Sequence, residues 1–217
     1  MNKNLWNDLH RTYKNQEWIN KASIFAEQAL DYFPAKGMVL DLGAGQAQDS
    51  CYFAECGYNV TATDIEDSAL ELAEKKASSK SLDIKIQKID LSEKLPFQTN
   101  SFDVVYSHLA LHYFDHETTT NIFNEIYRVL KPGGTLALLV NSVNDPQYKT
   151  GEMIEDDYFQ IGKSTKRYFS KDTINDFTQR FSIVVADEHG ETYKDSAVGI
   201  HNLVRFIGKK PLIEKGL

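Results

Sequence analysis

The sequence predicts an α/β fold, a Rossmann-like doubly wound sheet of mostly parallel strands with helices on both faces. Two observations lead to this prediction. Between residues 38 and 140, short apolar stretches alternate with segments of helical spacing, which is the rhythm of right-handed crossovers. A glycine-rich turn, Gly43-Ala44-Gly45, directly follows the first apolar stretch. The 217 residues are enough for one such domain with a full core.

The elements can be assigned in chain order from their periodicity. Residues 5–33 are predicted to be helical, and Pro34 and Gly37 then break the chain. Strands are predicted at 38–42, 58–63, 83–89, 102–107 and 135–140, with helices at 47–56, 68–77 and 122–130. The run Lys131-Pro132-Gly133-Gly134 is predicted to be a turn into the last of these strands.

The pattern changes after Val140. Residues 141–169 have no clear period but contain several aromatic side chains, and an irregular segment of this length predicts a lid or a substrate wall. A helix at about 171–180 and strands at 182–187 and 198–208 follow. No helix separates these two strands, so we expect them to pair antiparallel.

One domain is therefore expected for residues 1–217. We expect the following parts: an N-terminal helical cap (1–36), a cofactor-binding core (37–140), a lid or substrate insertion (141–169), and a C-terminal helix with an antiparallel strand pair (170–217). The cap contributes Trp6, Tyr13 and Trp18. Together with the aromatic residues of the insertion, these side chains predict a pocket that closes over a small molecule.

The composition narrows the class of partner. The 24 basic and 31 acidic residues give a net charge of −7, which argues against a broad phosphate-binding face and a nucleic-acid partner. Lys163, Lys166 and Arg167 could still form a local basic patch. Cys51 and Cys56 lack zinc-site spacing and are interpreted as reduced thiols of a cytoplasmic protein. No stretch is long enough to cross a membrane.

The glycine turn and Asp64, which closes the next predicted strand, point to a nucleoside-containing cofactor. Glycine lets the backbone approach a ligand closely, and an acid at a neighbouring strand end can bind a ribose diol. Two cofactor classes fit these features. A dinucleotide-binding turn has a third glycine, and Gln48 stands at that position here. This weakens the case for a nicotinamide cofactor without excluding it.

Six motifs in order resemble the class I S-adenosylmethionine-dependent methyltransferases of the small-molecule type. The resemblance covers about residues 38–140, and the flanks more loosely. Its motifs are Val39–Gly45, Asp64, Asp90-Leu91, Phe102–Ser107, Leu111–Phe114 and Leu130–Leu136. The resemblance implies a sheet of seven strands whose last strand is inserted antiparallel.

The same resemblance implies S-adenosylmethionine as the cofactor and gives roles to the motif residues. Asp64 would accept both ribose hydroxyls in charge-assisted bonds. Ile65 and Leu91 would sandwich the adenine, and Asp90 would accept a hydrogen bond from its amine. The other residues expected to bind the cofactor, at the turn and after the fourth strand, are Asp41, Gly43, Ala44, Gly45, Ser107 and His108.

Three histidines, His108, His112 and His116, are spaced four residues apart. On one helix they could form a metal site, but His108 directly follows a strand and is expected in a loop, so no metal is predicted. His108 is the candidate base near the methyl end of the cofactor. His112 is expected beneath the pocket. Together with Tyr148, Tyr158 and Tyr168 it completes the candidate substrate residues.

We therefore expect an enzyme, a methyltransferase that moves a methyl group to a small molecule by in-line displacement. The segment Ser107-His108-Leu109-Ala110 lacks the Asn/Asp-Pro-Pro-aromatic motif of enzymes that methylate planar amines. Three alternatives stay open: an NAD(P)-dependent oxidoreductase, a non-catalytic S-adenosylmethionine-binding protein, and a protein or RNA methyltransferase. The chain is expected to be a monomer or a homodimer.

Overall fold

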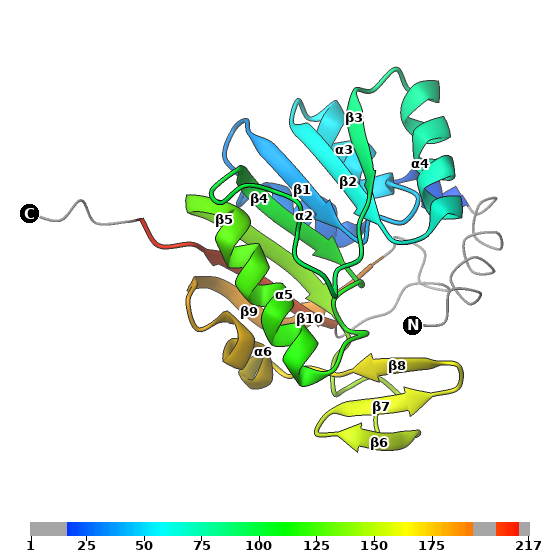
Figure 1. Ribbon diagram of the computed structural model, residues 1–217, viewed down its shortest axis with the longest axis vertical. Helices are drawn as coiled ribbons and strands as arrows, with labels where there is room; N and C mark the ends of the chain where they lie inside the picture. Colours follow the sequence, from blue (N-terminus) through cyan, green and yellow to red (C-terminus); the bar gives the residue numbers. More distant parts are fainter. Residues whose placement is uncertain (1–16, 193–202, 213–217) are drawn as a thin grey trace, which may run out of the picture.

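The computed structural model describes residues 17–192 and 203–212. Their largest unit is a seven-stranded sheet with the strand order β3-β2-β1-β4-β5-β10-β9 (Figure 1). Its strands are β1 (Met38–Leu42), β2 (Asn59–Asp64), β3 (Ile84–Lys88), β4 (Phe102–His108), β5 (Leu130–Val140), β9 (Ser182–Gly190) and β10 (Leu203–Lys209). Neighbours from β3 to β5 pair in parallel. β10 pairs antiparallel with both β5 and β9, so it alone is reversed. The predicted fold class is confirmed.

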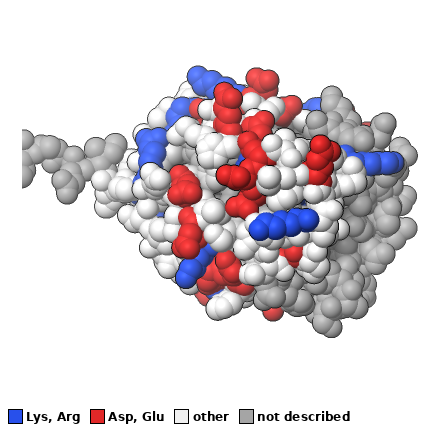
Figure 2. Space-filling view, turned by 90° about the horizontal axis from the view of Figure 1, so that it is seen from below, with Lys and Arg blue, Asp and Glu red and all other residues white. Residues whose placement is uncertain are grey.

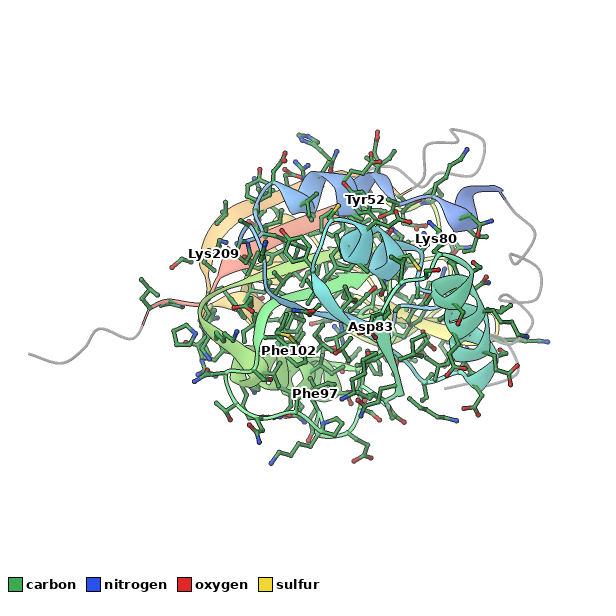
Figure 3. The ribbon with its side chains drawn as sticks, turned by 90° about the horizontal axis from the view of Figure 1, so that it is seen from above. Tyr52, Lys80, Asp83, Phe97, Phe102 and Lys209 are labelled. Carbon is green, nitrogen blue, oxygen red and sulfur yellow. The ribbon has the colours of Figure 1, made fainter. Side chains whose placement is uncertain are left out.

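Helices cover both faces of this sheet. They are α2 (Ile24–Leu30), α3 (Gln48–Glu55), α4 (Asp67–Ser79), α5 (His116–Val129) and α6 (Lys171–Thr178). One apolar core lies between the sheet and α2 and α3, and a second lies under α5 and α6. Figure 3 shows Tyr52 of α3 on one side of the sheet and Phe97 and Phe102 on the other.

The helix predicted over residues 5–33 is only partly present in its described part, where α2 (Ile24–Leu30) is helical but the residues before it are not continuous with it. A 3-10 turn, η1 (Glu17–Asn20), is separated from α2 by an extended stretch. Ser23 interrupts the helix because its backbone is extended and its side chain accepts a hydrogen bond from the Ala26 N–H at 3.0 Å. Trp6 and Tyr13 lie outside the described residues, as does the side chain of Trp18.

The turn predicted at residues 131–134 is instead the first part of β5. The Gly133 N–H donates to the Lys210 carbonyl at 2.8 Å, and the Lys210 N–H donates to the Gly134 carbonyl at 2.9 Å. The strand is irregular here, because the β4–β5 register shifts between Phe102 and Val104 and Gly133 has a φ of 80°. The partner that makes this segment a strand lies far along the chain.

The insertion after β5 was predicted to be irregular, but it forms a second sheet. Its strands are β6 (Glu152–Glu155), β7 (Tyr158–Ile161) and β8 (Ser164–Arg167), paired antiparallel in that order. Two-residue turns join them, and each turn contains one residue with positive φ, Asp157 at 58° or Gly162 at 57°. Figure 1 shows this small sheet in yellow, projecting below α5. Strands of four residues are too short to give a visible period.

Among the residues described, no helix has the length and apolar character needed to cross a bilayer.

Candidate functional site

A cavity opens at the carboxyl ends of β1 to β4. Because these strands are parallel, their ends and the loops that follow them meet at one edge of the sheet. The residues that line the cavity are Gly43, Asp64, Ile65, Ile89, Asp90, Leu91, Leu109, Ala110, Tyr113 and Phe114. Five of them are residues that the sequence had marked for cofactor binding: Gly43, Asp64, Ile65, Asp90 and Leu91.

The glycine turn after β1 forms the floor of the cavity. Gly43 has a φ of 72°, and a Cβ placed on it would lie 2.2 Å from the Cβ of Ala110. Only glycine therefore fits this contact without a shift of the chain. Hydrogen bonds tie the turn to β2: the Ala44 N–H donates to the Thr63 carbonyl at 2.7 Å and the Gly45 N–H donates to Asp64 Oδ2 at 2.9 Å.

Two main-chain donors hold the Asp64 carboxylate at the cavity wall. In addition to Gly45, the Glu66 N–H donates to Asp64 Oδ1 at 2.9 Å. A carboxylate has about four lone-pair positions, so each oxygen can accept a further hydrogen bond from a ligand. Asp64 is thus fixed in place by the turn and retains acceptor capacity toward the cavity.

Asp90 and Leu91 follow β3 on the opposite side of the cavity. The Oδ1 atom of Asp90 accepts two bonds from Ser92, from its N–H at 2.9 Å and from its hydroxyl at 2.6 Å. These bonds form a local turn and leave Oδ2 to face other partners. Leu91 and Ile65 supply apolar walls of the same cavity. A flat, partly polar group therefore fits at the ends of β2 and β3, beside the residues that follow them.

Asp41 and Ser107 lie beneath the turn instead of at the cavity surface. Asp41 is 2% exposed and accepts a hydrogen bond from the Ser50 hydroxyl at 2.5 Å. Burial, and then the negative charges of Asp49 and Asp64, raise the pKa of Asp41 to about 8. The Ser107 hydroxyl donates to the Leu42 carbonyl at 2.9 Å and so links β4 to β1. Both residues support the turn from below.

The three histidines fall on three separate elements. His108 is the last residue of β4, so its expected loop position is wrong. His112 lies in the following turn and is buried, and His116 is the first residue of α5. Burial lowers the pKa of His108, and burial, Lys166 and His108 together lower the pKa of His112 to about 3. In the part of the chain that the structure describes, no group of three or more His, Cys, Asp or Glu residues could hold a metal ion.

A buried polar network that the sequence did not reveal fixes α2 to the sheet. Asp49, in the first turn of α3, accepts hydrogen bonds from the Ser23 N–H at 2.7 Å and from the Ser23 hydroxyl at 2.9 Å. The Tyr106 hydroxyl of β4 donates to the same carboxylate at 2.7 Å. These residues are far apart in the sequence and follow no motif, so only the fold brings them together.

The small sheet holds the wall of the cavity. Its residues donate to three consecutive carbonyls: the Arg167 N–H to His112 at 2.8 Å, the Tyr158 and Thr165 hydroxyls to Tyr113 at 3.2 Å each, and the Arg167 Nε to Phe114 at 3.1 Å. The insertion therefore positions Tyr113 and Phe114, which line the cavity, without lining it itself. The sequence had marked Leu111–Phe114 as a motif but not its members as cavity residues.

The predicted substrate tyrosines occupy different places in the insertion. Tyr158 supports the cavity wall, as described above. The Tyr148 hydroxyl donates to Asp157 Oδ1 at 2.6 Å, in the turn between β6 and β7. Tyr168 is buried, with its ring centroid 5.4 Å from that of Tyr148. Burial is the main cause that raises the pKa of both Tyr148 and Tyr168 to about 12, so both hydroxyls stay protonated at neutral pH.

Comparison with known proteins finds that this chain is similar to methyltransferases. Residues 40–138 match the family described as "Methyltransferase domain". An uncharacterized methyltransferase of Synechocystis is 36% identical over 101 residues, which cover 46% of this chain and 45% of that protein. A ubiquinone/menaquinone biosynthesis C-methyltransferase of Desulfotalea psychrophila is 28% identical over 77% of this chain and 73% of its own length.

The solved structures agree with the sequence relatives. A protein of Methanosarcina mazei described as a SAM-dependent methyltransferase is 25% identical, with a TM-score of 0.74 over 85% of this chain and 97% of that one. The chain spans about half the length of the first sequence relatives that it matches, since the alignments cover 45%, 49% and 42% of them.

Proposed function

Since the chain belongs to the class I S-adenosylmethionine-dependent methyltransferase family, whose cofactor is S-adenosylmethionine, we propose that it transfers the methyl group of this cofactor to a small-molecule acceptor. One observation carries the proposal. The cavity at the strand ends combines a glycine turn, a carboxylate held by two N–H donors and apolar walls, which are the groups that an adenosyl amino acid requires.

The residues present fit the cofactor. Asp64 would accept hydrogen bonds from the ribose diol with the acceptor capacity that its two main-chain donors leave. Ile65 and Leu91 would pack on the adenine, and Asp90 Oδ2 would accept from its amine. The main chain at Gly43, Ala44 and Gly45 would reach the amino-acid head, while Asp41 and Ser107 support the turn from below.

When bound, S-adenosylmethionine supplies an activated methyl group and a neutral leaving group. The protein then has to hold the acceptor in line with the methyl group and exclude water. As part of this proposal, His108 at the end of β4 would meet the methyl end of the cofactor. Because burial lowers its pKa, the imidazole is neutral and serves better as a hydrogen-bond partner than as a strong base.

Three observations support a small-molecule acceptor. The cavity wall on the side of α5 is apolar and aromatic, through Leu109, Tyr113 and Phe114. Figure 2 shows one face of the molecule, on which acidic side chains gather across the middle and basic ones are scattered, without a continuous basic patch on the described part of this face. A relative named for ubiquinone/menaquinone biosynthesis points the same way.

The free thiols of Cys51 and Cys56 support a cytoplasmic location.

The alternatives differ in what they now require. A nicotinamide-dependent oxidoreductase does not agree with the family assignment. A protein that binds the cofactor without turnover has the same cavity, so activity separates it from an enzyme. Release of S-adenosylhomocysteine across a panel of metabolites would support the enzyme, whereas binding without release across a broad panel would favour the non-catalytic protein.

The first prediction tests the ribose contact. We expect Asp64→Asn to weaken S-adenosylhomocysteine binding about 10- to 100-fold, because hydrogen bonds to a charged acceptor contribute roughly 1.5–3 kcal/mol each. Isothermal titration calorimetry measures this affinity directly. The asparagine retains a carbonyl oxygen, so the turn loses less support than it would with alanine.

The matched control is Asp67→Asn. Asp67 also lies after β2, but its side chain is 73% exposed and pairs with Lys88 at 2.6 Å. Its loss should leave affinity unchanged. Equal affinities for wild type and Asp64→Asn would remove Asp64 from the cofactor site. Thermal stabilisation by NAD or NADP but not by S-adenosylhomocysteine would overturn the proposed function itself.

A further inference from the structure

Three buried polar atoms in and around the insertion have no hydrogen-bond partner among the described residues. They are His112 Nδ1, Asn141 Nδ2 and the Tyr168 hydroxyl, and each is inaccessible to water. The three residues are 2%, 4% and 1% exposed. A buried polar atom without a partner costs about 1–3 kcal/mol, so proteins rarely retain several without a use for them.

Backbone hydrogen bonds bring these residues to one place. The Arg167 N–H donates to the His112 carbonyl at 2.8 Å, and the Phe169 N–H donates to the Asn141 carbonyl at 2.9 Å. Tyr168 stands between these two contacts in the chain. The chain at the end of β8 therefore runs between the turn after β4 and the end of β5. Each of these three segments contributes one side-chain atom without a partner: Tyr168, His112 and Asn141, respectively.

A lysine adds positive charge to this place. Lys166 of β8 is half-buried, and burial lowers its pKa. Its charge also helps to lower the pKa of His112, so the two side chains are close enough to interact. Lys166 Nζ donates to a neutral acceptor, Gln147 Oε1, at 2.6 Å, and no described carboxylate lies within ion-pair distance of it. The ammonium is therefore available to an anion.

One carboxylate, Asp145, acts on this region from a distance. Its charge raises the pKa values of Lys166 and Tyr168, against the effect of burial on the lysine. Its Oδ1 accepts the Gln147 N–H at 2.7 Å, which holds it in its own turn. Asp145 thus keeps the lysine charged without pairing with it.

We propose that His112, Asn141, Lys166 and Tyr168, here called the donor cluster, bind a carboxylate group of the methyl acceptor. Asn141 Nδ2, the Tyr168 hydroxyl and the ammonium can all donate, and the neutral His112 can donate from Nδ1 in one tautomer. A carboxylate accepts several such bonds at once, and the positive charge selects it over a neutral group.

The position of the cluster suits an acceptor of the proposed methyl transfer, on which this inference rests. His112 lies between Ala110 and Tyr113, two residues that line the cofactor cavity. The ring of His112 has its centroid 4.3 Å from that of Tyr113. Because the donor atoms lie below the surface, the acceptor has to displace side chains of the insertion as it enters. An aromatic or apolar body beside the carboxylate would meet Tyr113 and Tyr148.

Benzoate and benzamide are matched probes, since they share a ring and differ in charge. With S-adenosylhomocysteine at saturation, we expect saturation-transfer NMR and titration to show benzoate binding at least 10-fold tighter than benzamide. We expect Lys166→Met and Tyr168→Phe to remove that preference. Lys163→Met is the control, because it deletes an exposed lysine of the same small sheet and should retain the preference.

A stability measurement separates ligand groups from structural ones. If the Tyr168 hydroxyl forms hydrogen bonds only with a ligand, Tyr168→Phe should leave the midpoint of urea unfolding of the ligand-free protein unchanged or raise it. A clear loss of stability, or equal binding of benzoate and benzamide, would overturn the donor cluster. Failure of S-adenosylhomocysteine to bind would instead count against the proposed function, so the two failures are distinguishable.

Discussion

At the scale of single residues, Asp41 is an acid in a place where an ionised carboxylate is costly. It is buried beneath the glycine turn, and burial raises its pKa to about 8 from an ordinary value of 3.8. A group whose pKa is higher in the folded state stabilises the fold below its unfolded pKa. That contribution is lost as the pH rises through the folded value. Because of Asp41, the free energy of unfolding should therefore fall as the pH rises from about 4 to about 8.

We expect Asp41→Asn to remove this dependence. The variant and the wild type should have similar unfolding free energies near pH 4. The variant should then become more stable by up to roughly 5 kcal/mol at pH 8, since about four pKa units separate the two states. Asparagine can still accept the Ser50 hydroxyl bond. Urea unfolding across this pH range measures the effect, and parallel curves for the two proteins would contradict it.

Gly43 gives a second prediction at this scale. In Gly43→Ala the new Cβ would lie 2.2 Å from the Cβ of Ala110, on a residue with a φ of 72°. The backbone strain alone costs about 1–2 kcal/mol, and the clash adds to it. Gly57→Ala is the control, because its φ is 90° and nothing lies within 4 Å of the added Cβ.

The clash has a specific remedy. Ala110→Gly in the Gly43→Ala background should recover the steric part of the loss but not the backbone part, leaving a deficit close to that of Gly57→Ala. Thermal or urea unfolding of the wild type, Gly43→Ala, Ala110→Gly and the double variant closes this cycle. If Ala110→Gly recovers nothing, the turn and the loop after β4 do not touch as described.

At the scale of elements, the small sheet acts on the cavity through Arg167. Its guanidinium has a side-chain exposure of 5% and pairs with Glu155 of β6. The Glu155 carboxylate also accepts the His116 N–H at the start of α5, at 2.6 Å. Arg167 therefore joins the small sheet, the cavity wall and the first turn of α5 in one set of bonds.

We expect Arg167→Gln to lower the unfolding free energy by about 2 kcal/mol, because hydrogen bonds from a charged donor are lost while Glu155 stays partly solvated. Hydrogen exchange should accelerate more at the amides of residues 112–116 and 158–168 than in β1 and β2. The control is Arg205→Gln, which breaks a pair with Asp187 between β10 and β9. Uniform acceleration across both sheets would contradict a local role.

The sequence predicted the elements that repeat and missed those that depend on distant partners. Alternation between residues 38 and 140 located the parallel strands, because buried strands and amphipathic helices have different periods. It could not show that residues 131–134 join β5, since the partner is Lys210. It also missed β6, β7 and β8, whose four residues each are too few to show a period.

The sequence could predict those residues of the candidate site that lie at or directly after the end of a strand. Asp64 could be marked because it closes a strand, and Asp90 because its position after a strand resembles a family motif; both line the cavity. Asp49 and Tyr106 could not, because their contact joins α3 to β4 with no motif between them. Leu109 and Ala110 were also missed as wall residues, since an apolar loop residue carries no chemical signature.

At the scale of the whole molecule, the sheet order explains why the site is at one edge. The chain runs outward from β1 to β3 and then returns to β4 beside β1. The loops after β1 and β4 therefore face each other where the direction of winding reverses, which is where ligands bind in open α/β sheets. The later strands extend the sheet on the far side and leave room for the small sheet beside the cavity.

Two acids near the glycine turn, Asp49 and Asp64, have a consequence for the proposed methyl transfer, whereas Asp41 is largely uncharged at neutral pH. Asp49 and Asp64 are close enough for their charges to act on Asp41, in a molecule with a net charge of −7. The methyl donor carries a positive sulfonium, and the demethylated product carries a neutral thioether in its place. A negative potential beneath the turn attracts the first more than the second. Under the proposed function, we therefore expect the spent cofactor to be held less firmly than the fresh one and to exchange more readily.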